Sequence, residues 1–211
     1  MLRYPRLAGF LIALTLTGAP AAHAHPHVWV TSSSELIYAP DGSVTGVRHA
    51  WTFDDMFSTY ALQGIETKTK GVYTREDLAP LAQVNVDSLK EFAYFTYAKV
   101  GAKKEKLGEP ADYFLEYKDS KLVLNFTLPL TVPAKTPELV LEIYDPSYFV
   151  NFVLAEKEPL KLVGAPAGCK LAVQKPAAAP PQQTMSEQNF LNGANANYGA
   201  NFANRMTVAC Q

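Results

Sequence analysis

Cysteine and histidine are scarce in this chain of 211 residues, which contains two cysteines and four histidines. No Cys-x-x-Cys pair is present, which excludes the common thiol redox motif. The sequence also lacks a phosphate-binding loop, a dinucleotide fingerprint and a recognisable Ser-His-Asp set. These absences argue against an enzyme, and we expect a protein that binds rather than catalyses.

An excess of positive charge is also missing. The chain has 19 lysines and arginines against 20 aspartates and glutamates, and its first 24 residues hold two of the arginines and no acidic residue. The remaining chain therefore has a net charge of −3, which provides no basic field for nucleic acid. A hydrophobic content of 48% and an aromatic content of 11% are typical of a globular protein.

Long hydrophobic runs are absent, because the longest one spans only residues 7–16. Arg3 and Arg6 precede it, and small residues up to Ala24 follow it, which is the pattern of a secretory signal peptide. The run is too short for a membrane-spanning helix. We therefore predict a signal peptide at residues 1–24 and an exported chain that begins at His25 and forms one domain, or one domain plus an extension.

The new N-terminus would carry two possible metal ligands, His25 and His27. A terminal histidine offers an α-amine and an imidazole, and imidazole binds zinc, copper, nickel and cobalt. Pro26 has no amide hydrogen, so the square-planar copper and nickel site that needs a deprotonated amide cannot form there. The alternative is that both histidines simply begin an edge strand.

Cys169 and Cys210 are the two cysteines, and a lone pair in an exported chain predicts a disulfide. Neither residue follows the predicted cleavage site, so we expect no lipid anchor. The pairing would attach a short last strand, residues 205–211, to the preceding domain. Residues 176–204 between them are rich in Pro, Ala, Gln and Asn, and predict a low-complexity linker.

Two β-rich runs, residues 27–38 and 43–53, flank the turn signal Pro40-Asp41-Gly42 and predict a hairpin. A two-residue loop at Asp41-Gly42 would place His49 opposite Ser34. That register puts His49 about 23 Å from the start of the first strand, at about 3.3 Å per residue. We therefore expect a packed, hydrogen-bonded His49 on the same face as the neighbouring aromatic residues, and no role for it as a partner of the terminal histidines.

Two helices are predicted after this hairpin, as an insertion at about residues 54–100. Asp54 is a suitable N-cap for the first helix. The second helix is predicted from Thr74 to about Val100, with Thr74 and Asp77 forming a capping box.

The loop between the helices has the length and the glycine of a calcium loop, with Glu66 first, Gly71 sixth and Asp77 twelfth. Lys68 and Lys70 stand where carboxylates should bind the ion, so we expect no calcium there. The similarity to a calcium loop can equally be chance.

Strand patterns return after the helices, at residues 112–118, 121–130, 139–144, 148–154, around 163 and 169–173. Together with the hairpin they predict an α+β fold: an antiparallel, β-rich, sandwich-like domain over residues 25–175 with a two-helix insertion.

Three motifs resemble those of one bacterial family of unknown function: HPHVW at 25–29, HAWTFDDMFS at 49–58 and YDPSYF at 144–149. Members of that family are commonly labelled as the periplasmic, substrate-binding component of an uncharacterised ABC-type transport system. They are often encoded beside permeases of the nickel/cobalt exporter type. The resemblance implies a periplasmic location, an inner-membrane transporter as partner and a role in metal handling. Members often carry an acidic Asp-x-Asp-x-Asp-Gly loop between the helices, which this chain lacks.

The first functional hypothesis is a metal-binding or metal-delivery protein for zinc, nickel, cobalt or copper. His25 and His27 would bind the metal, with Asp54 and Asp145 as candidate oxygen ligands. Asp54 can equally be only a helix cap, and Asp145 can equally only shape a turn before Pro146. No cofactor other than a metal ion is expected.

The second hypothesis is a non-metal interaction module that docks on a membrane partner through exposed aromatic residues, for which Tyr144, Tyr148 and Phe149 are candidates. A third, less favoured hypothesis is a copper enzyme with a terminal histidine brace. It needs a second histidine from a distant strand, and the hairpin register places His49 badly for that purpose.

Overall fold

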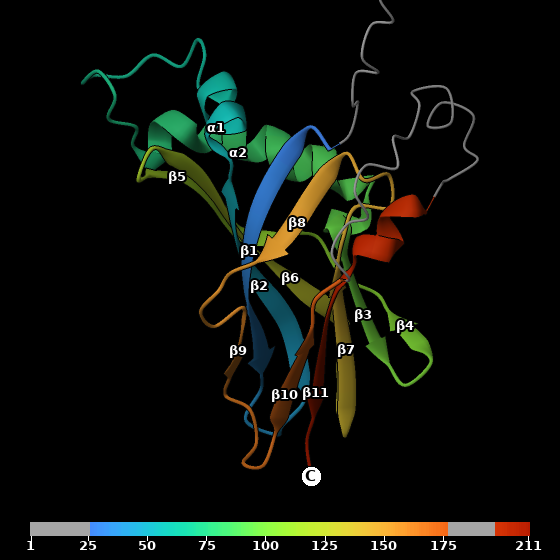
Figure 1. The fold of residues 1–211 in the computed structure, drawn as a ribbon. Helices are drawn as coiled ribbons and strands as arrows, with labels where there is room; N and C mark the ends of the chain where they lie inside the picture. The colour runs from blue at the N-terminus through green and yellow to red at the C-terminus, as the bar shows by residue number, and fades with distance from the viewer. Residues whose placement is uncertain (1–25, 177–196) are drawn as a thin grey trace, which may run out of the picture.

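The chain folds into two β-sheets with two α-helices at one end of the first sheet (Figure 1). The computed structural model describes residues 26–176 and 197–211. The predicted signal peptide and His25 lie outside the described residues. The β-rich architecture with two helices confirms the predicted α+β, sandwich-like fold class.

The first sheet has the strand order β5-β6-β2-β1-β8, and β9 also pairs with β1. Its strands are β1 (Val28–Tyr38), β2 (Val44–Phe53), β5 (Ala111–Lys118), β6 (Lys121–Ala134), β8 (Val150–Leu154) and β9 (Leu160–Val163). Most of its pairings are antiparallel, as predicted, but β8 and β9 run parallel to β1. Alternate residues of β1 and β6 are buried, which gives the sheet one core face.

The hairpin of β1 and β2 has the predicted register, with Ser34 opposite His49. Its loop is longer than predicted: Ala39 N–H donates to Ser43 O, and Gly42 N–H donates to Ala39 O. Pro40–Gly42 therefore form a three-residue loop, in which Gly42 takes a positive φ of 82° that favours glycine. A β-bulge in β2 restores the register beyond the loop.

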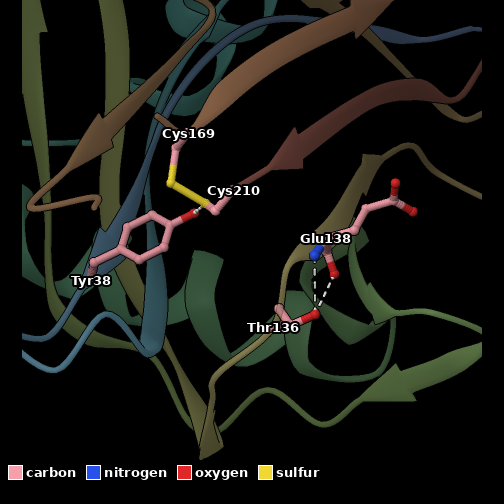
Figure 2. Close-up of a disulfide and its surroundings, with 5 residues drawn as sticks. All are labelled: Tyr38, Thr136, Glu138, Cys169 and Cys210. Atoms are coloured by element: carbon pink, nitrogen blue, oxygen red, sulfur yellow. Dashed lines mark hydrogen bonds between the residues drawn. A yellow bond between two sulfur atoms is a disulfide. The ribbon is translucent and has the colours of Figure 1, made fainter. Parts of the chain in front are cut away.

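The second sheet has the strand order β10-β11-β7-β3-β4. Its strands are β3 (Thr96–Val100), β4 (Lys103–Glu105), β7 (Glu138–Ile143), β10 (Lys170–Gln174) and β11 (Asn204–Ala209). The C-terminal strand β11 is thus an inner strand between β10 and β7, and not an appendage. The predicted disulfide is present: Cys169 and Cys210 are joined at 2.04 Å where β10 begins and β11 ends (Figure 2).

Side chains from both sheets and from the helices meet in one hydrophobic core. Trp51 of β2 is its central aromatic residue and contacts Phe126 of β6 and Phe152 of β8, each with 4.8 Å between ring centroids. Phe152 also contacts Phe95, next to β3, at 5.5 Å. These edge-to-face and tilted pairs fix how the first sheet packs against the second.

Part of the segment predicted as a linker is structured. Tyr198–Phe202 form a 3-10 helix, in which Phe202 is 8% exposed and stacks on Tyr148 at 4.1 Å. Gly199 lies against the chain at Asp145, where an added Cβ would be 1.7 Å from the Asp145 carbonyl oxygen. The prediction of a linker through residue 204 is therefore wrong for residues 198–204, because a glycine and two aromatic residues allow close packing there.

The helices are α1 (Asp55–Ala61) and α2 (Arg75–Lys90). The predicted capping box of Thr74 and Asp77 is present at the start of α2. The predicted extension of this helix to Val100 is wrong: α2 ends at Lys90, the 3-10 segment Ala93–Phe95 takes positive φ values, and β3 follows. Burial of Tyr94 and Phe95 and pairing of β3 with β7 outweigh the local helical pattern. Within the described ranges, no helix is long and apolar enough to cross a membrane.

Candidate functional site

The first strand begins beside two of the predicted site residues. His27 is exposed, its N–H donates to Phe149 O at 2.9 Å, and its ring lies 4.8 Å from the Phe149 ring. The parallel pair of Val28 and Val150 continues from this contact. The start of the strand is therefore held against the segment that leads into β8.

Asp54 occupies the N-cap position of α1, as predicted. Its Oδ1 accepts the Phe57 N–H at 2.9 Å, and its Oδ2 accepts the Trp29 N–H at 2.8 Å. Asp54 N–H in turn donates to Trp29 O at 2.9 Å. The Asp54 carboxylate thus accepts a hydrogen bond from a backbone N–H at the start of α1, and it also connects the start of β1 to this helix.

Asp145 is buried, with 2% of its surface exposed, and accepts hydrogen bonds from its own turn. Oδ1 accepts the Ser147 N–H at 2.8 Å, Oδ2 accepts the Val150 N–H at 2.9 Å, and the Ser147 hydroxyl contacts both oxygens. These bonds compensate the burial of the charge and shape the turn between β7 and β8.

In the part of the chain that the structure describes, no three His, Cys, Asp or Glu side chains lie close enough to hold a metal ion. Asp54 and Asp145 are engaged as cap and turn residues. His25 lies outside the described residues, so a metal site at His25 and His27 stays a prediction. Asp77, the twelfth residue of the loop that resembles a calcium loop, accepts the Thr74 N–H on its carboxylate at 2.9 Å.

His49 is packed in the core, as predicted, and is 1% exposed. Its Nδ1 lies 2.8 Å from Ser34 Oγ, and its Nε2 lies 3.2 Å from Thr96 Oγ1. Burial lowers the pKa of His49 to about 3. Both ring nitrogens have hydrogen-bond partners, and the imidazole joins β1 and β2 to the start of β3.

An apolar cleft of about 850 Å³ lies between the two helices and the Asp145 turn. We call it the helix cleft. One wall is formed by α1 and the residues after it, the second by α2 and the segment that follows it, and the third by the turn before β8. Its lining consists of Phe57, Tyr60, Ala61, Gln63, Leu81, Val84, Asn85, Ser88, Leu89, Phe92, Phe95, Asp145, Ser147, Phe149 and Val150.

Large apolar side chains in the helix cleft are unusually exposed. Tyr60 is 71% exposed, Val84 61%, Phe92 47% and Phe149 43%. Among the described residues that line the cleft, Asp145 is the one acidic residue, and none is a lysine, arginine or histidine. Such a surface favours an apolar group or chain segment over a charged ligand.

The aromatic candidates from the sequence separate in space. Phe149 lines the helix cleft, whereas Tyr148 stacks on Phe202 and Tyr144 contacts Tyr97 at 4.7 Å. Sequence reasoning did not identify the cleft, because its apolar helix residues have the same periodicity as core residues. Exposed Val84, between the buried positions Ala82 and Val86, is a weak signal of a second apolar face on α2.

One family model and one of two similar proteins match this chain over most of its length. Residues 10–210 match the family model described as "Protein of unknown function (DUF1007)". The chain is 23% identical over 195 residues to an "Uncharacterized protein" of Haemophilus influenzae, covering 89% of this chain and 92% of that one. It is 30% identical over 94 residues to the "Uncharacterized 15.5 kDa protein in trpE 3'region" of Spirochaeta aurantia, covering 44% of this chain and 66% of that relative. The chain therefore belongs to the DUF1007 family.

Proposed function

We propose that this protein is an exported accessory protein of an inner-membrane transporter, and that it docks an apolar segment of its membrane partner in the helix cleft. The observation that carries the proposal is the cleft itself, with four large apolar side chains between 43% and 71% exposed. Covering such side chains with a partner's apolar residues removes them from water, which favours association.

The shape of the cleft suits a peptide segment. It lies along α2, a helix of 16 residues, which spans about 24 Å at 1.5 Å per residue. Docking an amphipathic helix into an apolar groove between helices is a recurring recognition mode. The polar lining residues Gln63, Asn85 and Ser88 can hydrogen-bond the rim of such a segment.

Export to the periplasm is part of the proposal. The N-terminal pattern of a signal peptide supports it, and the disulfide is compatible with an oxidising compartment. The resemblance to periplasmic components of ABC-type transport systems, often encoded beside nickel/cobalt exporter-type permeases, supports a permease as the partner.

A photo-crosslinking residue at Val84 tests the docking proposal in the native host. Val84 is exposed in the cleft, and Val132 is a matched control because it is 67% exposed on β6 and does not line the cleft. We expect the Val84 position to form an adduct with an integral membrane transporter, at least tenfold more than the Val132 position. Adducts of equal yield from both positions contradict the proposal, as does a lipid found bound in the cleft by native mass spectrometry.

Metal delivery by the same accessory protein is the second candidate, and the exposed imidazole of His27 at the start of β1 favours it. Calorimetric titration of the processed chain beginning at His25, with zinc, nickel, cobalt and copper, tests it. We expect one tight site, weakened at least tenfold by one extra glycine before His25 and by His27→Asn. Equal affinity of the native and the extended forms would show that the terminal amine is not a ligand.

A further inference from the structure

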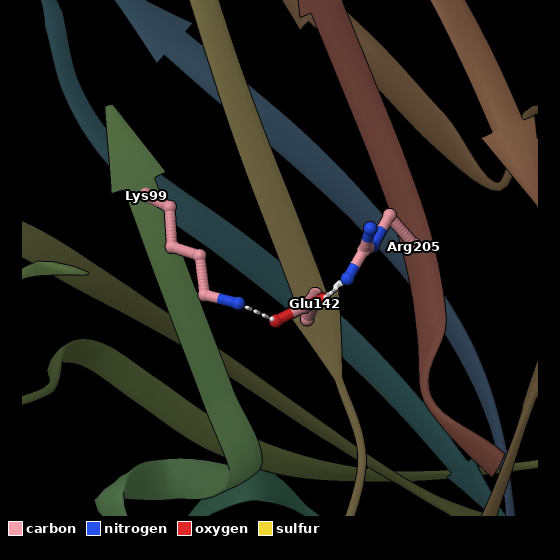
Figure 3. A network of polar contacts seen from close by, with 3 residues as sticks. All are labelled: Lys99, Glu142 and Arg205. Carbon is pink, nitrogen blue, oxygen red and sulfur yellow. Dashed lines mark hydrogen bonds and ion pairs between the residues drawn. The ribbon is translucent and has the colours of Figure 1, made fainter. Parts of the chain in front are cut away.

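A group of cations surrounds one buried carboxylate on the second sheet. Glu142 alternates with the core residues Leu141 and Ile143 along β7, so its side chain projects from the opposite face of the sheet. Its side chain is 6% exposed, and its carboxylate lies between Lys99 of β3 and Arg205 of β11 (Figure 3).

Glu142 holds both cations in place by charge-assisted hydrogen bonds. Lys99 Nζ donates to Oε2 at 2.6 Å, and Arg205 Nε donates to Oε1 at 2.9 Å. Burial acts to raise the pKa of Glu142, but the hydrogen bonds and charges of Lys99 and Arg205 outweigh it and hold that pKa below its ordinary value. The carboxylate is thus ionised and orders two long side chains that would otherwise move freely.

The same residues line a polar cavity of about 530 Å³, which we call the basic cavity. Lys104 and Lys175 complete its set of cations, and neither has an ion-pair partner among the described residues. Nearby Glu105 pairs with Lys103 instead, at 3.2 Å. The four cations and the one carboxylate of the lining leave an excess of three positive charges, although the chain as a whole has a net charge of −1.

We propose that the basic cavity binds an anion that carries phosphate groups. Lysine ammonium groups and an arginine guanidinium are the usual phosphate-binding side chains, and two of the four are held in position by Glu142. The Tyr144 hydroxyl and three carboxamide side chains in the lining offer further donors. Free phosphate compounds and phospholipid headgroups share this chemistry.

Titration calorimetry of the mature protein with inorganic pyrophosphate at low salt tests the free-anion source. We expect Lys104→Gln/Lys175→Gln to weaken binding at least tenfold, since it removes two cations that have no structural partner in the described ranges. The matched control is Lys118→Gln/Lys161→Gln, which removes two exposed lysines from β5 and β9 and should change affinity less than twofold. An unchanged melting temperature of each variant excludes misfolding.

Co-sedimentation with phosphatidylglycerol vesicles, compared with phosphatidylcholine vesicles, tests the lipid source. Binding to phosphatidylglycerol alone that is lost in the Lys104/Lys175 variant supports a headgroup as the ligand. The proposal is overturned if neither pyrophosphate nor phosphatidylglycerol binds, or if the control variant loses affinity as strongly as the Lys104/Lys175 variant.

Discussion

Replacing Cys169 and Cys210 with alanine is expected to lower the free energy of unfolding by about 4 kcal/mol. The two residues are 41 positions apart, and the chain-entropy relation for a loop of that length gives about this value. Without the disulfide, only the hydrogen-bonded pairing of β10 with β11 holds these two strands together. Because β11 is an inner strand between β10 and β7, its loss would expose both of its neighbours.

Urea unfolding with and without reductant measures this effect. The reduced wild type should unfold at the same urea concentration as the double alanine variant, and reductant should not affect the variant. The alanine at position 210 keeps the backbone N–H that donates to Pro137 O at 2.7 Å, but it loses the Sγ atom that lies 4.0 Å from the Tyr38 hydroxyl (Figure 2). A loss below about 1 kcal/mol would show that the backbone hydrogen bond and the strand pairing hold β11 without the bridge.

The parts of the fold that could be predicted depend on local patterns. Asp54 and the Thr74–Asp77 capping box were identified because capping uses hydrogen bonds between residues close in sequence. The pairing of Ser34 with His49 followed from one turn and the two-residue period of strands. Predicting the disulfide required only the observation that the sequence contains two cysteines.

The parts that could not be predicted depend on contacts between distant segments. The α2 helix ends at Lys90, ten residues before the predicted end, and Phe95 beyond it packs on Phe152, which lies more than fifty residues later in the chain. Phe202 lies in a segment of low complexity, and its burial needs Tyr148. Neither contact can be predicted from the sequence pattern around the residues that make it.

The two surfaces proposed as binding sites were missed for the same reason. The helix cleft combines Tyr60, Val84 and Phe149 from three separate segments, and none of these segments is unusual by itself. In the basic cavity, Lys99, Glu142 and Arg205 come from three strands that are adjacent only in the folded sheet. Sequence periodicity determines neither the packing of the two helices beside the turn before β8, which forms the helix cleft, nor the order of the strands, which forms the basic cavity.

Acidification between pH 6.5 and pH 5 is expected to destabilise the wild type more than a His49→Gln variant. The pKa of His49 is about 3 in the folded state, against about 6.5 for an ordinary histidine. Well above pH 6.5, His49 is neutral in both the folded and the unfolded state, so it has no effect on the pH dependence of stability. As the pH falls below 6.5, the unfolded state binds a proton that the buried imidazole does not, so stability decreases by up to about 1.4 kcal/mol per pH unit.

Chemical unfolding at pH 7.5, 6.5, 5.5 and 5.0 measures the difference between the two proteins. We expect the wild type to lose up to about 2 kcal/mol more than His49→Gln between pH 6.5 and pH 5. Any contribution of His27 is common to both proteins and cancels. This range also lies above the titration of Glu142, whose lowered pKa makes its stabilising ion pairs disappear only at more acidic pH.

Equal pH slopes in the two proteins would contradict a neutral, buried His49. Such a result would mean that the imidazole keeps its proton in the folded state, with both ring nitrogens donating to Ser34 Oγ and Thr96 Oγ1. The Thr96 hydroxyl donates to Tyr94 O and therefore accepts from His49 Nε2, whereas the Ser34 hydroxyl can either donate to Nδ1 or accept from it. The hydrogen-bond geometry alone therefore permits both the neutral and the charged imidazole. Burial between the two sheets decides in favour of the neutral imidazole, because desolvation penalises the charged form most strongly where exposure is 1%.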